Sequence, residues 1–129
     1  MSDEEVSKTV KVALIVEDDQ DIGAFILHAI LGETSHQAML VADGQQALET
    51  VKTVKPNLLV LDYHLPGMNG IELYDRLHAH KELEHVPAIL MSARLPKDEA
   101  RKRNITCLEK PFELDHLLKT VDDLINEPE

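Results

Sequence analysis

Short apolar runs alternate with amphipathic stretches along almost the whole chain, and this alternation limits the folds open to it. The apolar runs cover residues 10–16, 37–42, 57–62, 87–92 and 105–109. The stretches between them repeat apolar residues at helical spacing over residues 22–30, 47–54, 71–77 and 114–125. Three runs are almost continuously hydrophobic, which is typical of strands covered on both faces. The pattern predicts an α/β fold, with a parallel sheet and helices on both faces.

The length of 129 residues is that of one domain. We expect a flexible tail over residues 1–9 and a folded domain over residues 10–126. No apolar run approaches the ~20 residues of a membrane span, and the N-terminus is acidic and unlike a signal peptide. The one cysteine, Cys107, agrees with a reducing compartment. These features predict a cytoplasmic protein that does not contact membranes.

The formal net charge of −11 argues against direct binding to nucleic acid, which requires a basic face that neutralises phosphates. The one concentrated basic stretch is ARKR, at residues 100–103. It could be a solvated helix face or a docking patch, and we favour the solvated face.

Polar side chains follow four of the apolar runs, where each predicted strand ends. Acidic residues 17–19 follow the first run, and Asp62 ends the third. Ser92 ends the fourth run, and Lys110 follows the fifth. In an open parallel sheet these ends lie along one edge, where ligands bind. We therefore expect several carboxylates, one hydroxyl and one ammonium group to converge there.

Such a cluster requires a cation. Two carboxylates about 5 Å apart repel each other by roughly 3 kcal/mol at an effective dielectric constant of about 20. Carboxylates are hard ligands, and two of them with waters and a phosphate are typical of an Mg²⁺ site. A lysine and a hydroxyl beside the metal would suit the oxygens of a phosphoryl group.

Each of these residues also has a simpler explanation. Asp62 could begin a turn, and residues 17–21 could form the acidic first turn of a helix. Ser92 could be a helix cap, and Lys110 could be a surface lysine beside a turn. All four explanations would have to hold together, so we favour the phosphoryl-binding site.

Four motifs in this order carry a resemblance to a known family. VEDD, VLDYHLPGMNG, LMSA and KPF each lie at the end of a predicted strand. The chain resembles the receiver domain of two-component response regulators over about residues 10–126. The resemblance implies a doubly wound, flavodoxin-like fold with a five-stranded parallel sheet in the order 2-1-3-4-5.

The resemblance also implies roles for individual residues. Asp62 matches the aspartate that accepts a phosphoryl group from a histidine kinase or a phosphotransfer protein. Asp18 would ligate Mg²⁺ or Mn²⁺ directly, and Glu17 would act mainly through water. The backbone carbonyl of His64 would complete the metal site.

Two further residues match the phosphoryl-binding groups of the family. Ser92 corresponds to the hydroxyl that moves to bond the phosphoryl oxygens, and Lys110 corresponds to the lysine that pairs with them. The Lys110–Pro111 peptide is expected to be cis, which only proline makes inexpensive. The side chains of His64 and Arg94 would flank the route of the attacking water and tune the lifetime of the phosphoryl group.

The chain departs from the family on the surface that receivers use to pass on their signal. Cys107 stands where receivers commonly carry an aromatic residue, and no aromatic residue occurs in residues 82–110. The stretch between Ser92 and Lys110 is short for the family, so the helix at residues 96–103 should be short or irregular. We expect phosphorylation with an atypical output.

Other functions remain open on the sequence. A receiver-like module that is not phosphorylated could act by constitutive protein contact. A small-molecule phosphatase with an aspartate nucleophile would usually need a second aspartate where His64 stands, and a flavin site would need a first loop that is less acidic. The favoured function is a switch that catalyses its own phosphorylation and dephosphorylation without an external product. Its expected partners are the phosphoryl donor and an unidentified downstream protein, and the sequence leaves pairing with a second copy of the chain open.

Overall fold

The structure, a computed structural model, describes residues 10–126; the tail expected at residues 1–9 lies outside the described residues. The strands are β1 (Val12–Val16), β2 (Gln37–Val41), β3 (Leu58–Asp62), β4 (Ala88–Ser92) and β5 (Thr106–Glu109). The helices are α2 (Gln20–Glu33), α3 (Gly44–Thr50), α4 (Gly70–His78), α5 (Lys97–Lys102) and α6 (Leu114–Ile125), with a short 3-10 helix, η1 (Lys81–Leu83).

All five strands form one parallel sheet in the order β2-β1-β3-β4-β5, which confirms the predicted fold. The register pairs Val16 of β1 with Leu61 of β3. It also pairs Ser92 of β4 with Glu109 of β5. The carboxyl ends of the strands therefore lie along one edge, where the sequence predicts the site.

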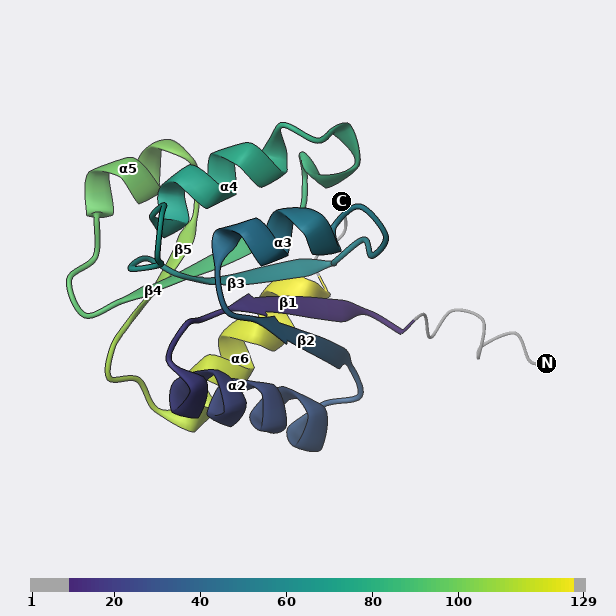
Figure 1. The fold of residues 1–129 in the computed structure, drawn as a ribbon. Helices are drawn as coiled ribbons and strands as arrows, with labels where there is room; N and C mark the ends of the chain where they lie inside the picture. The colour runs from purple at the N-terminus through teal and green to yellow at the C-terminus, as the bar shows by residue number, and fades with distance from the viewer. Residues whose placement is uncertain (1–9, 127–129) are drawn as a thin grey trace.

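The sheet separates two hydrophobic cores. Helices α3, α4 and α5 cover one face, and α2 and α6 cover the other (Figure 1). Neighbouring residues in β3 point to opposite faces: Leu59 and Leu61 pack in the first core, and Leu58 and Val60 in the second. This is why β1, β3 and β4 are hydrophobic at nearly every position.

Helix α3 differs from its predicted range. It begins at Gly44 because the Asp43 side chain caps it, accepting a hydrogen bond of 2.8 Å from the Gln46 N–H. It ends at Thr50, and residues 51–53 form a turn ahead of Pro56. The apolar pattern continues through this turn, so it overstates the length of the helix.

Helix α5 is short, as predicted, with six residues. The basic stretch at its end is only partly a solvated face. Arg101 and Lys102 are exposed, but the guanidinium of Arg103 pairs with Asp75 of α4 and with Glu99. Among residues 10–126, none of the helices combines the length and the apolar character needed to cross a bilayer.

Candidate functional site

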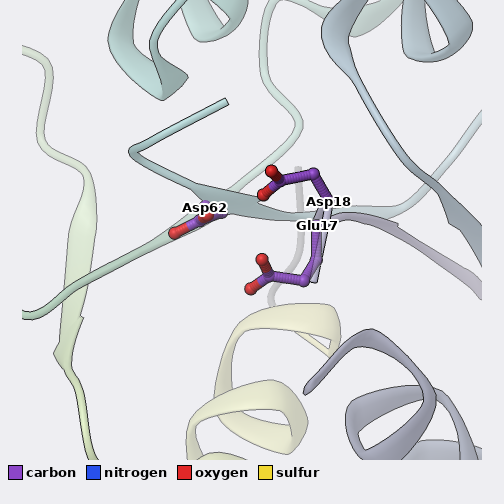
Figure 2. A group of neighbouring side chains, drawn as sticks. All are labelled: Glu17, Asp18 and Asp62. Carbon is purple, nitrogen blue, oxygen red and sulfur yellow. The ribbon is translucent and has the colours of Figure 1, made fainter. Parts of the chain in front are cut away.

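Three carboxylates gather at the ends of β1 and β3. Glu17 and Asp18 directly follow β1, and Asp62 is the last residue of β3, the neighbouring strand. One carboxylate oxygen from each residue lies within 4.8 Å of the others, and Figure 2 shows the three side chains together. Glu17 is 3% exposed and Asp62 is 4% exposed, whereas Asp18 faces solvent. The cluster thus has two buried members and one at its mouth.

Lys110 supplies the positive charge in this cluster. It follows β5, and its Nζ donates hydrogen bonds to Glu17 Oε1 at 3.0 Å and to Asp62 Oδ1 at 3.1 Å. The Lys110–Pro111 peptide is cis, as expected. One ammonium group therefore faces two buried carboxylates, and Asp18 adds a third negative charge at the mouth.

The pKa values of Glu17 and Lys110 reflect both burial and their charged neighbours. Burial raises the pKa of Glu17, and the nearby charge of Asp62 raises it further, although hydrogen bonds from Lys110 and the Asp19 N–H oppose this. Burial acts to lower the pKa of Lys110, but the hydrogen bonds to Glu17 and Asp62 outweigh it and raise that pKa. A cluster of oxygen ligands that keeps excess negative charge fits a hard divalent cation.

Asp19 has a different function from its two acidic neighbours. Its Oδ1 accepts hydrogen bonds from the N–H groups of Asp21 at 3.0 Å and Ile22 at 3.1 Å, which caps the start of α2. The simpler explanation of an acidic helix start therefore holds for Asp19 but not for Glu17 and Asp18, whose carboxylates lie in the cluster with Asp62.

Ser92 is near the cluster but is turned into its own loop. It is the last residue of β4 and is 1% exposed. Its Oγ donates to the Arg94 carbonyl oxygen at 2.8 Å and accepts from the Arg94 N–H at 3.1 Å. To donate to a phosphoryl group on Asp62, the hydroxyl would have to give up its hydrogen bond to the Arg94 carbonyl oxygen.

His64 lies in the loop between β3 and α4. Its ring makes an edge-to-face contact with Tyr63, at a centroid distance of 5.0 Å and an interplanar angle of 80°. Tyr63 in turn packs against the hydrophobic core under α3, α4 and α5. The loop that follows Asp62 is therefore anchored to the core through its first residue.

Gly70 belongs to the site, although the sequence reasoning does not identify it. Its N–H donates to the Tyr63 carbonyl oxygen at 2.8 Å, closing the loop after Asp62. A Cβ at this position would lie 2.6 Å from the Asp62 carbonyl oxygen and 2.8 Å from Leu90 Cδ1. In the sequence, Gly70 follows the capping residue Asn69 and opens an amphipathic helix, which marks only a helix start. The close approach of Gly70 to the backbone of Asp62 is visible only in the fold.

Cys107 is half-buried on β5, opposite Leu90 of β4. Burial raises the pKa of its thiol, and the charge of Lys97 acts in the opposite direction. Together with Ala100, Ile105 and neighbouring residues, it lines a hollow of about 350 Å³ beside α5. The thiol is small and uncharged, so it fills little of this space.

The chain matches the family model of the response regulator receiver domain over residues 13–122. It therefore belongs to the response regulator receiver domain family. The parallel sheet order and the acidic cluster beside Lys110 agree with this assignment.

Individual relatives extend this comparison. The sensor histidine kinase TmoS of Ectopseudomonas mendocina is 32% identical over 118 residues, which cover 88% of this chain but only 12% of that kinase. Sporulation initiation phosphotransferase F of Bacillus subtilis is 30% identical over 112 residues, which cover 84% of this chain and 89% of that protein. A solved structure of the chemotaxis protein CheY4 of Vibrio cholerae shares the fold, with a TM-score of 0.82 and 24% identity over 90% of this chain and 99% of that one.

Proposed function

We propose that this chain is a phospho-accepting switch of a two-component or phosphorelay pathway. Asp62 would take a phosphoryl group from the phosphohistidine of a histidine kinase or a phosphotransfer protein. The observation that carries this proposal is the convergence of Glu17, Asp18 and Asp62 around Lys110 at the carboxyl edge of the sheet. Two of the relatives, a sensor histidine kinase and a phosphotransferase, support the same class of chemistry.

In this reaction, a carboxylate oxygen of Asp62 attacks the phosphorus. The P–O bond forms while the P–N bond breaks, and its electron pair stays on the imidazole of the donor. Lys110, already bonded to Asp62, would pair with the phosphoryl oxygens. Water attack on the acyl phosphate later releases phosphate and restores the carboxylate, so the chain performs this chemistry only on itself.

The metal would be Mg²⁺ or Mn²⁺, held by Asp18, Asp62 and the backbone carbonyl of His64, with Glu17 acting mainly through water. When bound, it offsets the negative charge that the carboxylates and the phosphoryl oxygens bring together. Ser92 would leave its turn with Arg94 and donate to a phosphoryl oxygen. The side chains of His64 and Arg94 would adjust the lifetime of the acyl phosphate by controlling the approach of water.

The proposed receiver unit spans residues 10–126, and the proposed compartment is the cytoplasm, where histidine kinases present their phosphohistidine. Phosphorylation would change a protein-contact surface that includes α5 and β5. We propose that this output is atypical, because α5 has only six residues and the half-buried Cys107 stands where receivers commonly carry an aromatic side chain.

Incubation with acetyl phosphate and Mg²⁺, followed by intact-mass spectrometry, tests the proposal. We expect the wild type to gain one phosphoryl group in an Mg²⁺-dependent manner, and Asp62→Asn to gain none. Asp19→Asn is a matched control, because Asn caps a helix as well as Asp does and Asp19 serves the cap of α2. It should be labelled like the wild type.

Failure of the wild type to form an adduct, together with failure to trap beryllofluoride, would contradict the proposal. It would favour the alternative of a receiver-like module that acts by constitutive protein contact. The hollow beside Cys107 supports this alternative, because a side chain of a partner protein could occupy it without phosphorylation.

We also expect Mg²⁺ binding to depend on pH through Glu17. The pKa of Glu17 is raised above its ordinary value of 4.5, first by burial. The folded protein therefore holds a proton there more tightly than the unfolded chain, which favours folding at low pH and is lost as pH rises through the raised pKa. Because the metal needs the ionised carboxylate, Mg²⁺ should raise the melting temperature more at about pH 8 than at about pH 5.

Thermal unfolding with and without Mg²⁺ across this pH range provides the measurement. Glu17→Gln has no titrating group at this position and should flatten the dependence. An equal stabilisation by Mg²⁺ at both ends of the range in the wild type would show that protonation of Glu17 is not linked to the metal.

A further inference from the structure

Helix α5 depends on tertiary contacts for its position. It has six residues, its N-cap residue Pro96 makes no side-chain capping hydrogen bond, and Ala100 is its one buried residue. A helix of this length is not stable on its own in water. Whatever fixes α5 to the rest of the domain therefore decides where it lies.

A charged cluster joins the end of α5 to α4. We call it the Arg103 cluster, formed by Arg103, Glu99, Asp75 and Tyr74. Arg103 Nε and Nη2 donate to the two carboxylate oxygens of Asp75 at 2.7 and 2.8 Å. Arg103 Nη1 donates to Glu99 Oε1 at 2.8 Å and to the Glu99 carbonyl oxygen at 2.9 Å. A bidentate pair of this kind is specific in geometry as well as favourable in energy.

The α4 side of the Arg103 cluster is firmly held. The Tyr74 hydroxyl donates to the Arg103 carbonyl oxygen at 3.3 Å. The Tyr74 ring stacks on the His78 ring, with centroids 3.8 Å apart and an interplanar angle of 27°. His78 Nε2 lies 2.7 Å from the Val86 carbonyl oxygen, just before β4. Because α4 is tied in this way to the segment that leads into β4, Arg103 attaches the short helix to a fixed support.

The charges of the cluster persist through neutral pH. The hydrogen bonds from Arg103 lower the pKa of Asp75, and they also lower the pKa of Glu99. The side chain of Arg103 is 25% exposed, so the pair with Asp75 is partly protected from solvent.

The segment between β4 and α5 connects this cluster to the site. It is anchored at one end by Ser92 and at the other by Lys97, the first residue of α5. Ser92 Oγ is engaged with Arg94, and the Lys97 N–H donates to the Leu95 carbonyl oxygen at 3.0 Å. The Arg94 carbonyl oxygen that accepts from the Ser92 hydroxyl lies in this segment, so a fixed α5 keeps that acceptor in place and favours the hydrogen bond.

We propose that Arg103 is a positioning residue that sets how readily Ser92 turns toward Asp62. By holding α5 against α4, the Arg103 cluster favours the arrangement in which the Ser92 hydroxyl is bonded to Arg94. The inference rests on the proposed phosphorylation of Asp62 and deepens it. It assigns control of the switch to an ionic contact at the end of α5, outside the cluster of carboxylates.

The test compares Arg103→Gln with Arg101→Gln. Arg101 lies on the same helix, its side chain is 78% exposed, and its nearest carboxylate oxygen, on Asp98, is 3.7 Å away. Beryllofluoride with Mg²⁺, followed by NMR titration, reports binding of a phosphoryl mimic. Arg103→Gln should bind it about fivefold more tightly than the wild type, because less free energy is then spent on breaking the hydrogen bond from Ser92 to the Arg94 carbonyl oxygen. Arg101→Gln should bind it like the wild type.

Hydrogen exchange without beryllofluoride gives an independent readout. Amides of α5 should exchange faster in Arg103→Gln, while those of β1 and β3 should be unchanged. Asp75→Asn removes the other partner of the bidentate pair and should reproduce both effects, which covers the case in which Arg103→Gln folds poorly.

The outcomes separate the two proposals. If the wild type binds beryllofluoride and both Arg103→Gln and Asp75→Asn bind it with unchanged affinity, the inference is overturned and the proposed function stands. If the wild type itself binds no beryllofluoride, the proposed function and the inference fail together. Tighter binding confined to variants of the Arg103 cluster supports the inference.

Discussion

Lys110→Met is expected to lower the free energy of unfolding by about 3 kcal/mol near pH 8. The substitution leaves Glu17 and Asp62 buried without their ammonium partner, and an unpaired buried charge costs about 3–5 kcal/mol. The lower end of that range applies because the Lys110 side chain is 20% exposed. Without Lys110 the pKa of Glu17 rises further, so the loss should shrink as pH falls and Glu17 takes up a proton.

Urea unfolding monitored by circular dichroism measures this effect, with Lys119→Met as the control. Lys119 pairs with Asp123 at 3.2 Å, but its side chain is 75% exposed. Its removal should therefore cost less than about 1 kcal/mol. Mg²⁺ should restore part of the stability of Lys110→Met, since a divalent cation can balance the same carboxylates. A loss as small as that of the control would show that the carboxylates do not depend on Lys110.

Gly70→Ala is expected to lower the free energy of unfolding by about 3 kcal/mol. The new Cβ would lie 2.6 Å from the Asp62 carbonyl oxygen and 3.1 Å from Tyr63 Cα, and backbone atoms cannot move away as a flexible side chain can. Overpacking of this kind costs about 1–3 kcal/mol, and the two backbone contacts favour the upper end. The substitution should also slow phosphorylation, because the strain falls on the residue proposed to accept the phosphoryl group.

Gly32→Ala provides the matched control for this substitution. Gly32 lies within α2, and a Cβ there would meet no atom within 4 Å. Glycine is less favourable than alanine within a helix, so this replacement should stabilise the protein by up to about 1 kcal/mol. Urea unfolding of the two variants should therefore give shifts of opposite sign. A neutral Gly70→Ala variant would mean that the loop after Asp62 adjusts without strain.

The sequence predicts the fold well because the strong local patterns agree with the final packing. The strands β1, β3 and β4 lie within one or two residues of their expected ranges, since residues that alternate between two cores must all be apolar. The grouping of Asp62 with Lys110 follows from the parallel order of the strands. Helix α3 was harder to delimit, because apolar residues continue through the turn that ends it.

The remaining features depend on contacts that have no local sequence pattern. Arg103 and Asp75 are separated by 28 residues, and nothing in either segment indicates that their side chains meet. The turn in which Ser92 bonds Arg94 is a side-chain conformation that residue type alone does not specify. The close approach at Gly70 requires the exact path of two backbone segments.

Within residues 10–126, the two cores on opposite faces of the sheet share no side chain. A substitution among residues such as Leu73 or Leu77 should therefore change stability independently of one such as Leu117, since distant sites with no common partner are energetically additive. Descendants of a duplicated gene could then alter the α3–α4–α5 face for a new target while the α2–α6 face stays intact. The sheet thus allows the two faces of the domain to change independently, while the carboxylate cluster at its edge stays the same.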